Sequence, residues 1–168
     1  MKKQCYYIVM CAAVTLLSAC AGTGSSLKPG VATLPEIISE MGEPAMRWQD
    51  SDGQEQLAYP HGPVGVHTYM VFVGADGRLQ RIEQVLDEAH FARIQIGKST
   101  KEEVLRLIGP SYPVWTVEYK PLNQIVWEWN FNDRTNQVSR LDIYFDMSTG
   151  VVRNTQQRTV DSIYPRNR

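Results

Sequence analysis

The stretch GKSTKEEVLRLIGP (residues 97–110) carries the start and stop signals of one short helix. Thr100 is a suitable N-cap, because its hydroxyl can accept a hydrogen bond from an amide of the first turn. Glu103 follows three residues later, where its carboxylate can accept from the Thr100 amide and complete a capping box. Gly109 and Pro110 are typical of a helix end. The stretch therefore predicts a helix that begins after Thr100 and ends at Gly109.

The same pattern occurs 67 positions earlier, in GVATLPEIISEMGEP (residues 30–44). The matched pairs are Gly30 and Gly97, Thr33 and Thr100, Glu36 and Glu103, Ile37 and Val104, Ile38 and Leu105, Met41 and Ile108, and Gly42 and Gly109. Trp48 and Trp115 keep the same offset. So many matches at one offset predict an internal duplication, with Thr33, Glu36 and Gly42 as the caps of the first helix.

Each predicted helix is followed by alternating apolar and polar residues rich in Val, Tyr, Trp and Phe, which favours half-buried antiparallel strands. The expected strands are 55–59, 66–73 and 78–86 in the first copy, and 114–119, 124–131, 138–146 and 151–160 in the second. We therefore predict an α+β fold of two tandem units, each a short helical segment packed on a three-stranded antiparallel sheet. The first unit covers residues 30–90, the second covers residues 91–161, and residues 162–168 form a C-terminal tail.

The first nineteen residues have the pattern of a signal peptide. Lys2 and Lys3 precede an apolar run at 6–17, which is too short to span a bilayer. The run ends in LSAC (residues 17–20), which resembles the lipobox of bacterial lipoproteins, where lipid is attached to the cysteine. The alternative is an ordinary secretory signal in which Cys20 is incidental. Cys20 would be the single cysteine of the mature chain, which favours lipid attachment.

The resemblance to lipoproteins implies an anchor of acyl chains such as palmitate on Cys20. Because Ala21 rather than Asp follows the cysteine, the outer membrane is the expected location, with the protein facing the periplasm. Residues 20–29 are small and polar, and they predict a flexible tether. Without the signal peptide the chain has 15 basic and 18 acidic residues, a net charge of −3. We therefore expect no binding to nucleic acid.

The helix pattern resembles the signature of the BamE (SmpA/OmlA) family, the small accessory lipoproteins of the outer-membrane β-barrel assembly machinery. The matching stretches are IGKSTKEEVLRLIGP (96–110), VWEWNF (126–131), LDIYFDMSTGVV (141–152) and MGEPAMRW (41–48). The resemblance implies BamE-like units in a non-enzymatic scaffold that binds this machinery or another periplasmic protein. Related tandem units occur in the β-lactamase inhibitory proteins, which implies an alternative: an inhibitor that captures a periplasmic enzyme on its sheet face.

No residue pattern predicts catalysis, a metal site or a cofactor. The capping role explains both Glu36 and Glu103, and no close helical or strand pairing of His61 with His67 is expected. A small hydrolase or metal-binding enzyme stays a third hypothesis. The arginine-rich tail is interpreted as a solvated chain end.

The aromatic residues are the better candidates for binding a partner. Trp127 and Trp129 alternate with Glu128, so they share one side of a strand, and Tyr144 lies on the next strand. A partner could use them as anchors, or the tryptophans could fill the core between helix and sheet. For Trp48 and Trp115 the core is the favoured interpretation.

Overall fold

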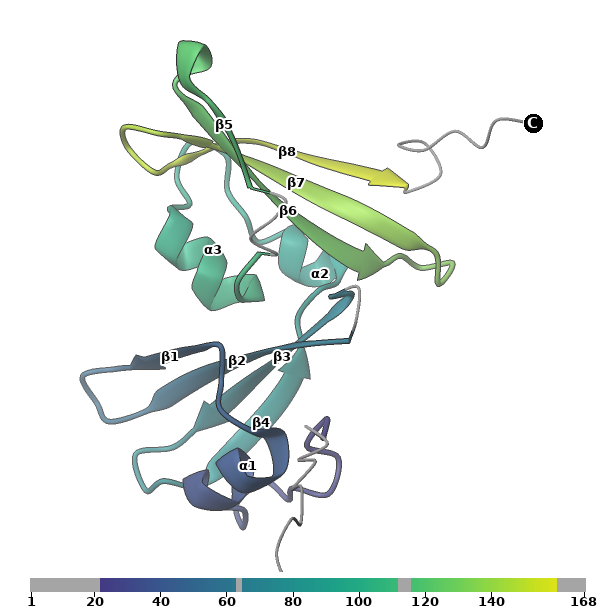
Figure 1. Ribbon diagram of the computed structural model, residues 1–168. Coiled ribbons are helices and arrows are strands. Elements are labelled where there is room, and N and C mark those ends of the chain that lie inside the picture. Colours follow the sequence, from purple (N-terminus) through teal and green to yellow (C-terminus); the bar gives the residue numbers. More distant parts are fainter. Residues whose placement is uncertain (1–21, 63–64, 112–115, 160–168) are drawn as a thin grey trace, which may run out of the picture.

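The computed structural model describes residues 22–62, 65–111 and 116–159, and these residues form two four-stranded antiparallel sheets (Figure 1). Each sheet keeps its strands in sequence order. The first sheet contains β1 (Met46–Gln49), β2 (Glu55–His61), β3 (His67–Val73) and β4 (Leu79–Gln84), and the second contains β5 (Val117–Tyr119), β6 (Gln124–Asn132), β7 (Val138–Asp146) and β8 (Val152–Thr159). The helices are α1 (Leu34–Met41), α2 (Glu88–Phe91) and α3 (Lys101–Ile108).

The prediction of two α+β units with three-stranded sheets is wrong. An edge strand, β1 or β5, adds a fourth strand to each sheet, and the described chain is β-rich with short helices. Strand β1 is four residues long and begins two residues after Pro44, so its sequence is easily taken for the loop that follows a helix. Its pairing partner is β2, with Met46 opposite Ala58 and Gln49 opposite Glu55.

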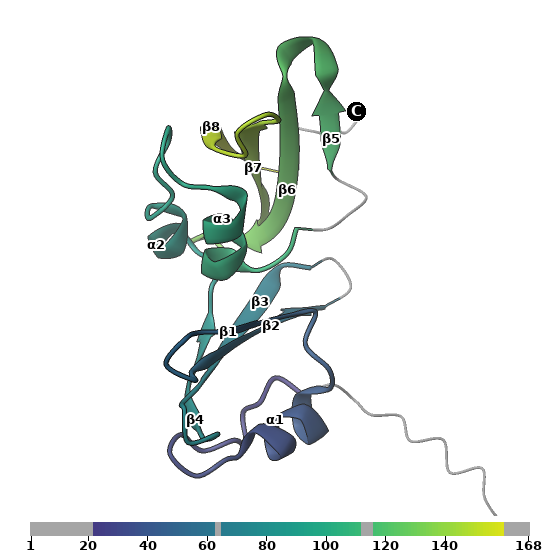
Figure 2. The ribbon, with the colours of Figure 1, turned by 90° about the vertical axis from the view of Figure 1, so that its left-hand side faces the viewer.

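The helices and sheets alternate as layers. Figures 1 and 2 show α1 against one face of the first sheet, and α2 and α3 between the two sheets. One core cluster joins Ile37 and Met41 of α1 to Leu57 and Val71 of the first sheet. The other cluster is larger and draws on both sheets and on α3. Its buried members include Ala58, Met70, Val104, Ile108, Trp129, Phe131, Leu141, Ile143 and Phe145.

Equivalent backbone contacts recur in the two halves of the chain. The amide of Gly30 donates to the carbonyl of Leu79, and the amide of Gly97 donates to that of Val152, both at 2.8 Å. Isolated bridges pair Thr33 with Arg78 and Thr100 with Val151, so each N-cap touches the start of the last strand of its own sheet. One arrangement is therefore built twice, and each helix of eight residues is tied at its N-terminal end by backbone bonds to its sheet.

The caps lie where the sequence predicts them. The Thr33 amide donates to Oε2 of Glu36 at 2.7 Å, and the Thr100 amide donates to Oε2 of Glu103 at 2.8 Å. Both helices end in a glycine with positive φ, but ψ is −171° at Gly42 and −173° at Gly109. This conformation is open essentially to glycine alone.

The segment 22–29, expected as part of a flexible tether, instead packs on the first half of the molecule. The Gly22 amide donates to the Glu40 carbonyl at 3.1 Å, and the Ser26 hydroxyl donates to the Glu40 carboxylate. Leu27 contacts the core cluster beneath α1. The predicted signal peptide, Cys20 and the tail at 162–168 lie outside the described residues.

Helix α2 contributes to the core of the second half, although residues 88–90 were assigned to the first unit. The Asp87 carboxylate accepts from the His90 amide at 2.9 Å and caps the helix. The rings of Phe91 and Phe131 meet edge to face, with centroids 4.9 Å apart. The change from one half to the other therefore comes after β4, and α2 connects the sheets.

Candidate functional site

The second sheet has one face packed on helices and one face pointing away from them, which we call the outer face (Figure 1). Strand pairing arranges the outer side chains in cross-strand rows, because successive residues alternate between faces. One row holds Val117, Val126 and Tyr144, and the next holds Glu128, Asp142 and Gln156. Within the described ranges, no helix or strand lies over this face.

The three predicted partner-binding residues are divided between the two faces. Trp127 and Trp129 share one side, as predicted, and that side is the helix-facing core. The Trp127 ring lies 4.8 Å from that of Phe145, and Trp129 is only 2% exposed. Trp129 cannot contact a partner without opening the core, so its assignment as an anchor is wrong. Tyr144 is half-buried on the outer face, where its hydroxyl donates to Oε1 of Gln156 at 3.2 Å.

Two diagonal ion pairs neutralise the centre of the outer face. A guanidinium nitrogen of Arg140 lies 3.1 Å from a carboxylate oxygen of Glu128. Arg158 is paired with Asp142, whose side chain is fully buried. Sequence reasoning missed this network, although Glu128 and Asp142 each stand between two apolar residues, which places both acids on the face opposite those residues.

Burial sets the titration of both acids. Loss of hydration raises the pKa of Asp142 above its usual value, against the opposing effect of Arg158. Loss of hydration likewise raises the pKa of Glu128, although Arg140 favours its ionised form. Burial on the outer face therefore favours the protonated form of both carboxyl groups, and the two arginines partly offset this effect by stabilising the ionised form.

The pH dependence of stability should reveal Asp142. A carboxyl with a raised pKa in the folded state contributes stability that is present below its unfolded pKa and is lost as pH rises through the folded pKa. We therefore expect wild type to gain stability relative to Asp142→Asn as pH falls from 7 towards 4, measured by urea unfolding.

Asp133 is the matched control for this prediction, because the Thr135 hydroxyl and the Gln137 amide lower its pKa. Its contribution is present above the unfolded pKa and is lost on acidification. Wild type should therefore lose stability relative to Asp133→Asn over the acidic range. If the stability difference between wild type and variant changed with pH in the same direction for both variants, the raised pKa of Asp142 would be contradicted.

The edge of the outer face carries the β5–η2 rim, which we define as Val117, Tyr119 and Leu122. Their exposed fractions are 39%, 47% and 61%, which is high for large apolar residues. Strand β5 is an edge strand, and the 3₁₀ turn η2 (Lys120–Leu122) leads from it into β6. An apolar rim beside a strand edge is a feature of protein-binding surfaces.

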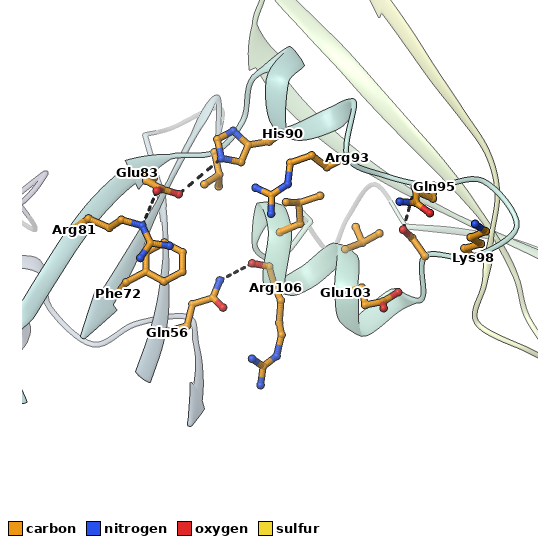
Figure 3. Close-up of a pocket in the computed structure, with 14 residues that line it drawn as sticks. Gln56, Phe72, Arg81, Glu83, His90, Arg93, Gln95, Lys98, Glu103 and Arg106 are labelled. Atoms are coloured by element: carbon orange, nitrogen blue, oxygen red, sulfur yellow. Dashed lines mark hydrogen bonds and ion pairs between the residues drawn. The ribbon is translucent and has the colours of Figure 1, made fainter. Parts of the chain in front are cut away.

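A cleft of about 600 Å³ lies between the first sheet and α3 (Figure 3). Two of its cations are engaged. Arg81 lies 3.5 Å above the Phe72 ring, with its Nε 2.7 Å from Glu83. Arg106 reaches across to Asp50 at 2.7 Å.

The cleft also contains a direct bond between the two halves, because the Gln56 amide donates to the Arg106 carbonyl. In Figure 3 the Arg93 side chain points into the cleft, and no described residue pairs with it. Most polar groups here satisfy one another. We therefore interpret the cleft as the seam that joins the halves rather than as a ligand site.

The histidines differ in their surroundings. His90 has its Nδ1 2.8 Å from Asp87 and its Nε2 3.9 Å from Glu83. The expectation that His61 and His67 are not paired across strands is wrong, because the β2–β3 register makes them direct partners.

No three His, Cys, Asp or Glu side chains gather as a potential metal site in the part of the chain that the structure describes. Among the described helices, none has the length and apolar character needed to cross a bilayer. Cys20 and Trp115 lie outside the described residues, whereas Trp48 packs half-buried against the larger core cluster.

Comparisons with known proteins do not assign the chain to a family. No protein-family model matches the chain, and no curated protein matches it. A crystal structure of an extracellular protein containing an SCP domain, from Bacillus anthracis str. Ames, aligns with 97% of this chain at 12% identity and a TM-score of 0.30. The chain spans 50% of that protein's length, and a likeness at this level indicates neither a shared fold nor a shared function.

Proposed function

We propose that this protein is a non-enzymatic scaffold, anchored in the outer membrane by lipid on Cys20, that binds a protein partner in the periplasm. The lipobox and the BamE resemblance favour the β-barrel assembly machinery as that partner. The observation that carries the proposal is the outer face of the second sheet, where the β5–η2 rim adjoins a charge-neutralised centre.

The outer face suits a protein better than a small ligand. Its central charges already have partners, so a binding protein need not strip water from a lone ion. Tyr119 and Leu122 offer rigid and apolar anchors at the rim, where buried aromatic residues typically dominate binding energy. Strand β5 has only β6 as its hydrogen-bonded neighbour in the described sheet, which leaves an edge for strand addition.

Affinity purification from detergent-solubilised envelopes tests this function. We expect wild type to recover subunits of the assembly machinery, and Tyr119→Ser with Leu122→Ser to reduce recovery by at least about tenfold, since each interface anchor typically contributes about 2 kcal/mol. Ile96→Ser is the matched control, because Ile96 is 57% exposed and belongs neither to β5 nor to η2.

Three outcomes would contradict the proposal in different ways. Recovery without any assembly subunit would remove the specific partner. A single periplasmic hydrolase, inhibited by the purified protein, would instead favour the enzyme-inhibitor function. An equal loss with Ile96→Ser would show that the rim is not the binding surface.

A further inference from the structure

The first sheet holds a pair of imidazoles that the proposed function does not use. His61 ends β2 and His67 begins β3, and they are the closing pair of the ladder between these strands. Directly opposed residues point to the same face, with Cβ atoms about 4.5–5.5 Å apart. The backbone pairing therefore places both imidazole side chains on the same face at neighbouring positions.

The packing around the pair keeps both rings ordered. The ring of Tyr69 lies 5.9 Å from that of His61, edge to face, and 6.2 Å from that of His67, nearly parallel at 12°. Tyr69 is itself opposite Tyr59, so four rings form two adjacent cross-strand rows on this face. Ordered rings lose little freedom when they bind a ligand in common.

The ring nitrogens of the pair have no competing partner in the part of the chain that the structure describes. Among the described residues, neither His61 nor His67 has a hydrogen bond or ion pair, and their contacts are with the Tyr69 ring. Both side chains are half-buried and so reachable from solvent. His90 shows the contrast, since two carboxylates hold its ring.

We propose that His61 and His67 form a two-histidine site for a divalent transition metal, with Cu²⁺ bound more tightly than Ni²⁺ or Zn²⁺. Neutral imidazole is a preferred ligand of these ions, and Cu²⁺ has the highest affinity for nitrogen ligands in the divalent series. Mg²⁺ and Ca²⁺ require oxygen ligands and should not bind. No carboxylate or thiol completes a larger ligand set in the described chain, so water or an external donor fills the remaining positions.

Metal binding would also tie β2 to β3 at the end of the ladder next to the loop that joins them. The paired geometry exists only in the folded state, so binding must raise thermal stability. This gives the site a readout that is independent of any partner.

Calorimetric titration of the full chain, purified in detergent without a histidine tag, tests the site with Cu²⁺ alone. We expect one ion per chain and a rise in melting temperature. His67→Asn and His61→Asn should each weaken binding by at least about tenfold, because loss of even a supporting residue costs about 10–100-fold at metal sites. His90→Asn is the matched control and should bind like wild type.

Circular dichroism confirms that each variant is folded before titration. Equal Cu²⁺ affinity in wild type and the double variant His61→Asn/His67→Asn would overturn the proposal, as would an equal loss in His90→Asn. Binding of Mg²⁺ with similar strength would also overturn it, because that result would indicate nonspecific attraction to acidic groups.

Discussion

Gly109→Ala is expected to destabilise the protein by about 2–6 kcal/mol, the sum of two effects. The φ of 77° and ψ of −173° at Gly109 place an alanine in a strained region, at a cost of about 1–3 kcal/mol. A Cβ at this position would also lie 2.7 Å from Cγ2 of Thr68, which belongs to the first sheet. Relieving that overlap costs about 1–3 kcal/mol in a packed interior.

Gly42→Ala is the matched control, because Gly42 has the same backbone conformation but nothing within 4 Å of its added Cβ. Urea unfolding should give a loss of about 1–3 kcal/mol for this variant, from backbone strain alone. Thr68→Ser removes the clashing methyl and should restore part of the stability of Gly109→Ala in a double-mutant cycle. Equal losses at Gly42 and Gly109, with no rescue by Thr68→Ser, would show that the close approach of the halves has no energetic effect.

The two capped helices were predictable because each rests on local chemistry. A threonine hydroxyl, a glutamate three residues later and a glycine that tolerates positive φ are all properties of neighbouring residues. The longer strands were predictable for a similar reason, since alternation is itself local. The fourth strand of the first sheet was not, because β1 is four residues long and exists through pairing with β2, whereas β5 lies inside the strand expected at 114–119.

The site was only partly predictable. The parity of Trp127 and Trp129 shows that they share a side, but not which side faces the helices. Ile125 and Phe131 lie on the same side of β6 as the tryptophans, whereas Glu128 and Asn130 lie on the other side. A comparison of the two full sets would have placed both tryptophans in the core. The β5–η2 rim carries no comparable signal, because its exposure depends on the edge position of β5 in the sheet.

The position of α3 between two sheets is also beyond sequence reasoning. Val104 and Ile108 mark one apolar face, which is sufficient for a helix on a single sheet. The contact of α3 with Ala58 and Met70 comes from long-range packing, because these residues belong to the first sheet. The periodicity of the sequence shows that one face of a helix is apolar, but it does not show how many sheets pack against the helix.

Ile108→Ala is therefore expected to weaken both sheets at once. Ile108 has no exposed surface and belongs to the core cluster shared by the two sheets. Deleting a buried isoleucine side chain to alanine costs about 2–5 kcal/mol, depending on how well the cavity closes. Urea unfolding should show this loss in a single transition, because neither sheet keeps its own separate core on the α3 side.

Amide hydrogen exchange measures which strands lose stability in this variant. In Ile108→Ala, protection should fall together in β2 and β3 of the first sheet and in β6 and β7 of the second. Leu105→Ala is the matched control on the same helix, since Leu105 is half-buried outside the shared core and its loss should cost less than about 1 kcal/mol. Wild-type protection in β2 and β3 with reduced protection in β6 and β7 would mean that the sheets unfold independently. In that case α3 would belong energetically to the second sheet alone, despite its contacts with both.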